Sequence, residues 1–371
     1  MKKILILVVA LVLVFTLAAC GGGGGGNQGS SSGDGLTIGF IYIGAINDGG
    51  FTQTHHNGTM KLQEEYGNTI NCIWLEDIDD TNTQAAKDAA KQLIDQGAKV
   101  VIGTSFGFGT PMFELAESGD YDDIIFMHFS GYHINENNFG NYFGAMEEPR
   151  YLSGIIAGMQ TTTNKLGYVA AYPYTEVKIG INAFALGAQS VNPDAVVSVV
   201  YINSWYDPAM EKQAAEALLA QGCDVITQHA DTPGPQLAAA DAGAFAIGYN
   251  LDNSGLEGLE NAFLTAPVWH HENYLIPAVR AILDGNWTPE SYYGTMAEGY
   301  ISLAPLTRNV TAEARAKVEE VQAKIEAGTF PIFTGPIYDN AGNEVVPAGV
   351  SLDRAGIWEI EYHVKGVTAS E

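Results

Sequence analysis

From Leu36 onward, short hydrophobic runs alternate with segments whose apolar residues recur at helical spacing. This alternation is typical of a parallel sheet flanked by helices. The runs predict strands at residues 37–43, 71–75, 100–103, 124–129, 167–171, 196–202, 225–228 and 244–249. The helical spacing predicts helices at residues 54–66, 83–96, 151–160, 179–190, 208–221, 272–283 and 312–327. The pattern therefore indicates an α/β protein.

The pattern also repeats within the chain. Residues 89–100 align with residues 214–225, and each segment reads as a helix, a glycine that ends it and a buried strand. Two Rossmann-like lobes joined by a hinge would leave a cleft between two sets of strand ends, which is where open α/β sheets bind ligands. We therefore expect an interlobe binding site.

The N-terminus resembles a bacterial lipoprotein signal. Lys2 and Lys3 precede an apolar run of 16 residues, which is shorter than the ~20 that a membrane-spanning helix needs. The run ends in Leu-Ala-Ala-Cys at residues 17–20, which resembles a lipobox, so we expect Cys20 to be acylated. The alternative is an ordinary secretory signal with an incidental cysteine. We assign residues 1–19 to the signal peptide and 20–35 to the lipidated cysteine and a Gly/Ser tether.

Charge and cysteine content exclude several classes of protein. The 371 residues include 43 acidic and 17 basic side chains, giving a formal net charge of −26, whereas nucleic-acid binding requires a basic face. We therefore expect no nucleic acid partner. Three cysteines are too few for a disulfide framework or a zinc cage, and Cys72 and Cys223 fall in different lobes. We expect both to be free, buried thiols.

One segment matches a catalytic motif. Residues 103–107 read Gly-Thr-Ser-Phe-Gly after a predicted strand, as in the nucleophile elbow of serine hydrolases. However, Gly109 and Pro111 follow closely, so a helix cannot start directly at Ser105 as the elbow requires. A secreted hydrolase using Ser105 remains the alternative from a different class, and we expect no enzyme.

Metal and cofactor motifs are weak. The histidine pairs at 55–56 and 270–271 are adjacent in sequence, so their side chains diverge and cannot chelate one ion together. No dinucleotide fingerprint follows the first predicted strand, and no Walker lysine is found. We expect neither a metal nor a cofactor.

Aromatic and small polar residues gather where predicted strands end. Flat rings opposed across a cleft could sandwich a planar ligand, and Asn and Asp side chains could bind its edge. The candidates are Asn47, Asp48, Phe51, Phe106 and Phe108 in the first lobe, and Tyr172, Trp205, Asp231, Asn250 and Asp252 in the second.

Several strings together resemble the basic membrane protein family of ABC-transporter substrate-binding lipoproteins. The resemblance extends from Leu36 to about Gly366. It rests on residues 47–51 (NDGGF), 104–108 (TSFGF), 150–152 (RYL), 167–171 (GYVAA), 180–184 (GINAF), 203–208 (NSWYDP), 227–229 (TQH) and 247–249 (IGY). The resemblance adds Asn182 and Trp269 to the candidate ligand contacts.

The resemblance implies a type I periplasmic-binding fold with three hinge crossings, and receptors for purine nucleosides or purine bases. Phe51 and Trp205 would stack on the purine. Lobe 1 would comprise residues 36–147 and 269–371, and lobe 2 residues 148–268. The helix at 312–327 and a hairpin turn at 339–343 would pack on lobe 1.

Three departures from the family pattern favour a free base such as adenine. Asn250 stands where nucleoside binders carry a carboxylate for the ribose. Gly-Gly-Phe at 49–51 replaces the usual Asp-Lys-Ser-Phe, and no lysine accompanies Trp269. We therefore expect a monomeric, lipid-anchored receptor on the outer face of the cell membrane that delivers a purine to ABC permease subunits. A sugar, an amino acid, a signalling molecule, or ligand transfer to a membrane kinase remain alternatives.

Overall fold

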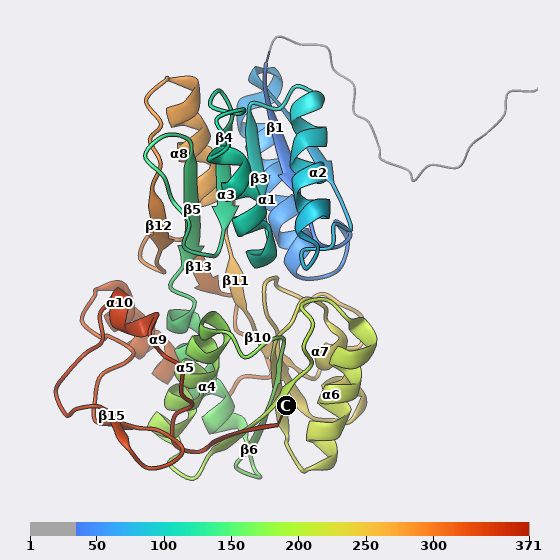
Figure 1. The fold of residues 1–371 in the computed structure, drawn as a ribbon. Coiled ribbons are helices and arrows are strands. Elements are labelled where there is room, and N and C mark those ends of the chain that lie inside the picture. The colour runs from blue at the N-terminus through green and yellow to red at the C-terminus, as the bar shows by residue number, and fades with distance from the viewer. Residues whose placement is uncertain (1–34, 371) are drawn as a thin grey trace, which may run out of the picture. The chain divides into compact units, whose positions relative to one another are not determined.

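The computed structural model describes residues 35–370 (Figure 1). The predicted signal peptide, Cys20 and most of the tether lie outside these residues. Within residues 35–370, no helix is long and apolar enough to cross a membrane.

The first sheet is entirely parallel, in the order β12-β5-β4-β3-β1-β2. Its strands are β1 (Leu36–Ile41), β2 (Ile70–Leu75), β3 (Val100–Gly103), β4 (Ile125–Phe129), β5 (Phe139–Gly144) and β12 (Ser291–Gly294). The helices of this lobe are α1 (Phe51–Tyr66), α2 (Thr83–Asp95), α3 (Gly109–Ala116) and α8 (Glu272–Leu283), with 3-10 turns at Gly67–Thr69 and Phe106–Phe108. We call this unit lobe 1.

The second sheet is also parallel, in the order β10-β9-β8-β6-β7-β16. Its strands are β6 (Lys165–Ala170), β7 (Val196–Tyr201), β8 (Val225–His229), β9 (Phe245–Ile247), β10 (Phe263–Thr265) and β16 (Val367–Ser370). The helices are α4 (Glu147–Gln160), α5 (Thr175–Val191), α6 (Pro208–Ala220), α7 (Gly234–Asp241), α9 (Ala312–Glu326) and α10 (Arg354–Ile357). We call this unit lobe 2.

The two lobes repeat the same helix-to-strand connection, as the sequence predicts. Gly97 after α2 and Gly222 after α6 both adopt positive φ, +98° and +90°, which a residue with a side chain rarely adopts. The residue after each glycine donates its backbone N–H to the carbonyl of the leucine five positions earlier, Leu93 or Leu218, which is the 6→1 hydrogen bond of the Schellman motif. Each glycine thus turns the chain directly into the strand that follows.

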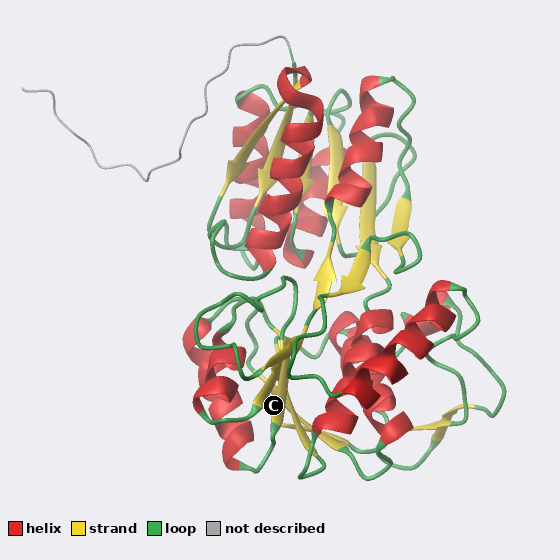
Figure 2. Cartoon of the chain, turned by 180° about the vertical axis from the view of Figure 1, so that it is seen from behind, coloured by secondary structure: helices red, strands yellow, loops and turns green. Residues whose placement is uncertain are grey.

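Three chain segments cross between the lobes. The first joins β5 to α4, and the other two contain β11 (Pro267–Trp269) and β13 (Ile301–Leu303), which pair antiparallel as a short ribbon between the sheets (Figures 1 and 2). The predicted α/β architecture with a three-segment hinge is therefore confirmed.

The C-terminal segment corrects the expected lobe assignment. We expected everything up to residue 371 to return to lobe 1, but β16 pairs with β7 at the edge of the second sheet and α9 packs on α4. The reason is the apolar stripe of α9, where Val318, Val321 and Ile325 are buried. The predicted hairpin at 339–343 is confirmed, between β14 (Ile337–Tyr338) and β15 (Glu344–Val346).

Candidate functional site

A cavity lies between the two lobes at the carboxyl ends of their strands, and we call it the interlobe cavity. Its volume is about 30 Å³, well below the ~300–1,000 Å³ usual for small-molecule sites, so the cavity is narrow. Its lining is Ile43, Phe51, Phe106, Phe129, Ser130, Phe143, Glu176, Trp205, His229, Asp231 and Tyr249.

Lobe 1 contributes a wall of aromatic rings. Phe51 begins α1, and its ring meets Phe129 at the end of β4 edge-to-face, with centroids 5.8 Å apart. Phe129 in turn packs against Phe143 at 5.1 Å. These ring contacts hold the three side chains of the wall against one another.

Lobe 2 contributes the opposing wall. Trp205 lies in the loop after β7, where Tyr172 meets it edge-to-face at 5.3 Å. Tyr172 stacks on Tyr174 at 5.0 Å, and the Tyr174 ring contacts Phe106 of lobe 1 with centroids 5.5 Å apart. Aromatic rings from both lobes therefore enclose the cavity.

Two carboxyl groups face this apolar space. Asp231 follows β8, is 4% exposed, and its Oδ2 has no hydrogen-bond partner among the described residues. Burial raises the pKa of Asp231 well above its usual value, and the nearby carboxylates of Glu211 and Asp48 raise it further. Burial also raises the pKa of Glu176 to about 7, although the Ser130 hydroxyl donates a 2.5 Å hydrogen bond to it.

A histidine completes the polar lining. His229 ends β8, its Nε2 lies 3.3 Å from the Tyr249 hydroxyl, and its Nδ1 has no partner among the described residues. Burial and the Arg150 guanidinium hold the pKa of His229 well below its ordinary value, so the ring is neutral. Arg150 itself lies over the Tyr249 ring, with Cζ 3.9 Å from the ring centre.

The structure brings four of the predicted ligand contacts together. Phe51, Phe106, Trp205 and Asp231 line the interlobe cavity. Asn250, Asp252 and Trp269 line a different cavity on the hinge side. Tyr172 supports Trp205 without lining either cavity.

The remaining predicted contacts have structural partners or lie outside. Asp48 accepts hydrogen bonds from the backbone N–H groups of Gly50, Thr52 and Gln53, so it caps the start of α1, whereas Asn47 is exposed. Phe108 is fully buried in the core of lobe 1. Asn182 bonds the backbone of Tyr362 and Val364, so it holds the C-terminal segment.

The sequence analysis missed Ser130, Glu176, His229 and Tyr249 as cavity residues. His229 and Tyr249 stand at strand ends inside strings already noted for the family, so position could have found them. Glu176 lies in the first turn of α5. An acidic residue there is also expected simply because it interacts favourably with the helix dipole, so the sequence does not mark it as a cavity residue. Ser130 carries no sequence signal beyond its place after β4.

The predicted alternative chemistries lack the required geometry. The Ser105 hydroxyl donates to the Asp80 carboxylate at 2.6 Å, and it is the Ser105 carbonyl, not its hydroxyl, that meets His128. Cys72 and Cys223 are free, as predicted, but only Cys223 is buried, because Cys72 lies on the edge strand β2. Among the residues that the structure describes, no cluster of three His, Cys, Asp or Glu side chains is placed to hold a metal.

Direct contacts join the lobes across the cavity. The Phe51 N–H donates to the Asp231 carbonyl at 3.2 Å, and Asn253 donates its amide to the Gly49 carbonyl at 3.1 Å. The Ser130–Glu176 hydrogen bond also spans the lobes. The structure therefore shows the lobes closed on each other.

This geometry agrees with comparison to known proteins. The family model of PnrA-like ABC transporter substrate-binding proteins, Bmp, matches residues 36–332. The chain belongs to this family. The family predicted from the sequence strings is thus confirmed, and it is one of solute-binding proteins that serve ABC transporters.

Two curated relatives are similar over most of their length. A purine-binding protein of Brucella abortus is 36% identical over 90% of this chain and 93% of its own. A Haloferax volcanii protein named as an ABC transporter glucose-binding protein is 36% identical over 85% of this chain and 78% of its own. Among solved structures, an ABC transporter solute-binding protein of Aeropyrum pernix has the same fold, with a TM-score of 0.69 at 17% identity over 79% of this chain and 92% of its own.

Gly50 tests whether closure depends on close backbone contact. A Cβ at Gly50 would lie 1.8 Å from the Asp231 carbonyl oxygen, so Gly50→Ala should hold the lobes apart. Small-angle X-ray scattering should show a larger radius of gyration than for the unchanged protein. Gly255→Ala is the matched control, because nothing lies within 4 Å of its added Cβ. A Gly50→Ala scattering curve identical to the control would contradict this role.

The raised carboxyl pKa values predict how stability depends on pH. Glu176, Glu147, Glu148 and Glu211 have pKa values near 7 when folded, raised by burial from about 4.5. The folded chain therefore keeps protons that the unfolded chain loses between pH 4.5 and 7, and the free energy of unfolding should fall as pH rises through that window. Glu272 has the opposite shift, to about 2, so stability should also fall below pH 4.5.

Urea unfolding of the ligand-free protein at several pH values measures this dependence. The free energy of unfolding should be greatest near pH 5. Glu176→Gln should make its decline between pH 5 and pH 7 shallower. Stability that rises steadily from pH 5 to pH 7 would show that the buried carboxyl groups are ionised in the folded protein.

Proposed function

We propose that this chain captures a purine base such as adenine in the interlobe cavity and presents it to an ABC permease. The observation that carries the proposal is a narrow cavity walled by aromatic rings from both lobes, with an unpartnered buried carboxyl group, Asp231, inside it. Such a site favours a flat ligand that donates hydrogen bonds.

The aromatic walls suit a flat ring. Phe51 belongs to lobe 1 and Trp205 to lobe 2. Both side chains can therefore contact the same ligand ring only when the lobes close. Stacking of a base on an aromatic side chain contributes ~1–3 kcal/mol. Ligand binding would therefore stabilise the closed arrangement.

The polar lining suits the edge of a purine. The raised pKa of Asp231 favours its neutral carboxyl form, which accepts through its carbonyl oxygen and donates through its hydroxyl. The edge of adenine offers both N–H donors and ring-nitrogen acceptors to such a group. The carboxyl group of Glu176 provides a further partner for ring nitrogens. The Brucella relative, named as a purine-binding protein, supports the same ligand class.

The site favours a base over a nucleoside. At about 30 Å³ the cavity must widen to admit a ring, and a ring with an attached sugar would need more space still. Asn250, expected near the ribose, lines the other cavity and accepts a 3.1 Å hydrogen bond from Trp269 through its Oδ1.

A sugar is the second candidate, because the Haloferax relative is named as a glucose-binding protein. Sugar hydroxyls would also donate to Asp231, and aromatic rings often face sugar rings. The ligand screen below separates the two candidates.

We further propose that Cys20 is acylated and anchors the protein to the outer face of the cell membrane. The apolar run and Leu-Ala-Ala-Cys at 17–20 support this. When the full chain is expressed in a bacterium, Cys20→Ser should move it from the membrane fraction to the soluble fraction and abolish palmitate labelling. Equal palmitate labelling of Cys20→Ser would refute the anchor.

A thermal-shift screen of the protein from Gly35 onward tests the ligand, after denaturation and refolding to remove carried-over solute. The panel holds purine bases, their nucleosides, pyrimidines, glucose and amino acids. Ligand at 100 times its dissociation constant adds ~2.7 kcal/mol, which corresponds to a shift of several degrees. We expect adenine or another purine base to give this shift.

The same screen is run on Trp205→Ala, which should weaken base binding by ~1–3 kcal/mol through loss of stacking. Tyr132→Ala, at a 72% exposed aromatic outside the cavity, is the control and should bind normally. A shift with glucose alone would replace the purine proposal with the sugar candidate, and an unchanged Trp205→Ala affinity would remove Trp205 from the site.

A further inference from the structure

Arg150 places a positive charge in the core of lobe 2. It lies on α4 and is 0% exposed, and none of its three guanidinium nitrogens has a hydrogen-bond partner among the described residues. Within residues 35–370, no carboxylate oxygen therefore lies within hydrogen-bond distance of the guanidinium. A buried charge that is neither paired nor hydrogen-bonded is strongly unfavourable. A counter-ion would offset this cost.

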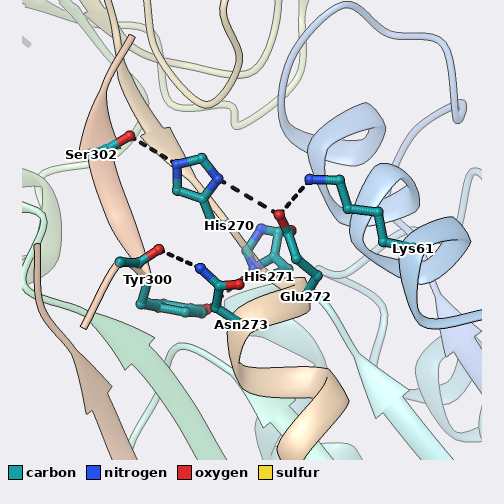
Figure 3. A network of polar contacts seen from close by, with 8 residues as sticks. Lys61, His270, His271, Glu272, Asn273, Tyr300 and Ser302 are labelled. Carbon is teal, nitrogen blue, oxygen red and sulfur yellow. Dashed lines mark hydrogen bonds and ion pairs between the residues drawn. The ribbon is translucent and has the colours of Figure 1, made fainter. Parts of the chain in front are cut away.

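Another cationic side chain shows how such a charge is usually balanced. Lys61 on α1 pairs with the carboxylate of Glu272 at the start of α8, which His270 also approaches at 3.7 Å (Figure 3). Although burial raises the pKa of Glu272, hydrogen bonds from His270 and Lys61 lower it to about 2, so this carboxylate stays ionised beside the lysine. Arg150 is more deeply buried than Lys61 and has no such carboxylate among the described residues.

The close neighbours of Arg150 are aromatic rings. Its Cζ lies 3.9 Å from the ring centre of Tyr249 and 5.4 Å from that of Tyr168. An aromatic face attracts a cation but carries no net charge. Burial raises the pKa of both phenols, that of Tyr168 to about 12, although Arg150 lowers both, so both hydroxyls stay protonated. The two rings therefore do not neutralise the guanidinium.

Two further buried polar atoms face the same place as Arg150. A Cβ on Gly180 of α5 would lie 3.4 Å from the Tyr168 hydroxyl, 3.5 Å from the Nδ1 of His229 and 3.6 Å from the Nε of Arg150. All three atoms are buried without a hydrogen-bond partner among the described residues. They belong to β6, β8 and α4, so three elements of lobe 2 direct polar atoms to one point beside Gly180.

All three groups can donate a hydrogen bond towards this point. A guanidinium only donates, and a protonated phenol can donate. Burial, and then Arg150, lowers the pKa of His229, so its ring is neutral, and its Nε2 lies 3.3 Å from the Tyr249 hydroxyl. When that hydroxyl donates to Nε2, the proton of the ring is on Nδ1, which then donates as well. Three donors and one positive charge around a point are the chemistry of an anion site.

We propose that Arg150, Tyr168 and His229 bind a small monovalent anion such as chloride in the core of lobe 2. The anion neutralises the guanidinium and accepts hydrogen bonds from the other two groups. Because the three atoms lie within 3.6 Å of one point, the place suits a single atom and not a larger oxyanion such as sulfate. The inference goes beyond the proposed function, since it does not depend on which solute the interlobe cavity binds.

The anion also has a consequence for the interlobe cavity. His229 and Tyr249 both line that cavity. An anion at Nδ1 holds the His229 ring in the tautomer whose Nε2 accepts from the Tyr249 hydroxyl. The site therefore supports two side chains of the cavity wall from behind.

Thermal unfolding in two sodium salts tests the site in solution. The melting temperature of the ligand-free protein is measured in sodium bromide and in sodium gluconate at equal ionic strength, because gluconate is too large for the place. An ion that binds only the folded protein stabilises it by mass action. Bromide at ~100 times its dissociation constant should therefore raise the melting temperature of the unchanged protein by several degrees over gluconate.

Three variants separate the site from general salt effects. Gly180→Ala should fold, because its methyl group meets the three polar atoms at ordinary contact distances and alanine favours a helix, but it should lose the bromide shift. Gly255→Ala, with nothing within 4 Å of its added Cβ, is the matched control and should keep the shift. Arg150→Met removes the charge while keeping an unbranched side chain against Tyr249, and should also lose the shift.

A crystal soaked in sodium bromide tests the position of the ion. Anomalous diffraction should place bromide between Arg150, Tyr168 and His229. A water molecule there without anomalous signal would overturn the proposal, as would a Gly180→Ala protein or an Arg150→Met protein that keeps the full bromide shift. Bromide in the crystal without any bromide shift in solution would be an adventitious ion only, and would overturn it too.

Discussion

The buried carboxyl group of Asp231 is the constraint on which the closed structure depends. Its Oδ2 has no partner among the described residues, and a buried polar group left unpaired costs ~1–3 kcal/mol. The Asp231 carbonyl also accepts the Phe51 N–H across the cavity, so closure itself buries this residue. A ligand that donates to the carboxyl group removes the cost of closing. Recognition and lobe closure are therefore coupled through one residue.

The electrostatics of the site follow from the same constraint. The chain carries a formal net charge of −26, and further carboxylates surround Asp231. Burial raises the pKa of Glu176 to about 7, so this group can be protonated near neutral pH and act as donor or acceptor. Burial, followed by the guanidinium of Arg150 that lies buried against Tyr249, lowers the pKa of His229 well below its ordinary value.

The repeated α/β units were predictable from the sequence, because hydrophobic periodicity and the glycines that end the helices both recur along the chain. The sequence predicted Phe51, Trp205 and Asp231 in the cavity because residues at the ends of parallel strands meet at one edge. It failed for Asn182 because a helical residue can face either the cleft or the neighbouring chain, and nothing in the sequence showed the contact with Val364. It also missed β5, whose two glycines weaken the strand pattern, and the short β10, β11 and β13.

The C-terminal lobe assignment failed for a related physical reason. Edge strands gain pairing partners from distant segments, and neither the partner of β7 nor the surface covered by α9 can be identified from local pattern. Asn250 and Trp269 show the same limit in the site. Each is predicted as a ligand contact, but both line the separate cavity on the hinge side and are hydrogen-bonded to each other.

A crystal structure of the refolded protein grown with adenine tests the central claim most directly. The account predicts the purine ring between Phe51 and Trp205, with an amino group or ring nitrogen within hydrogen-bond distance of the Asp231 carboxyl group. Adenine bound elsewhere, or in the cavity with Asp231 still unpartnered, would contradict the coupling of recognition to closure.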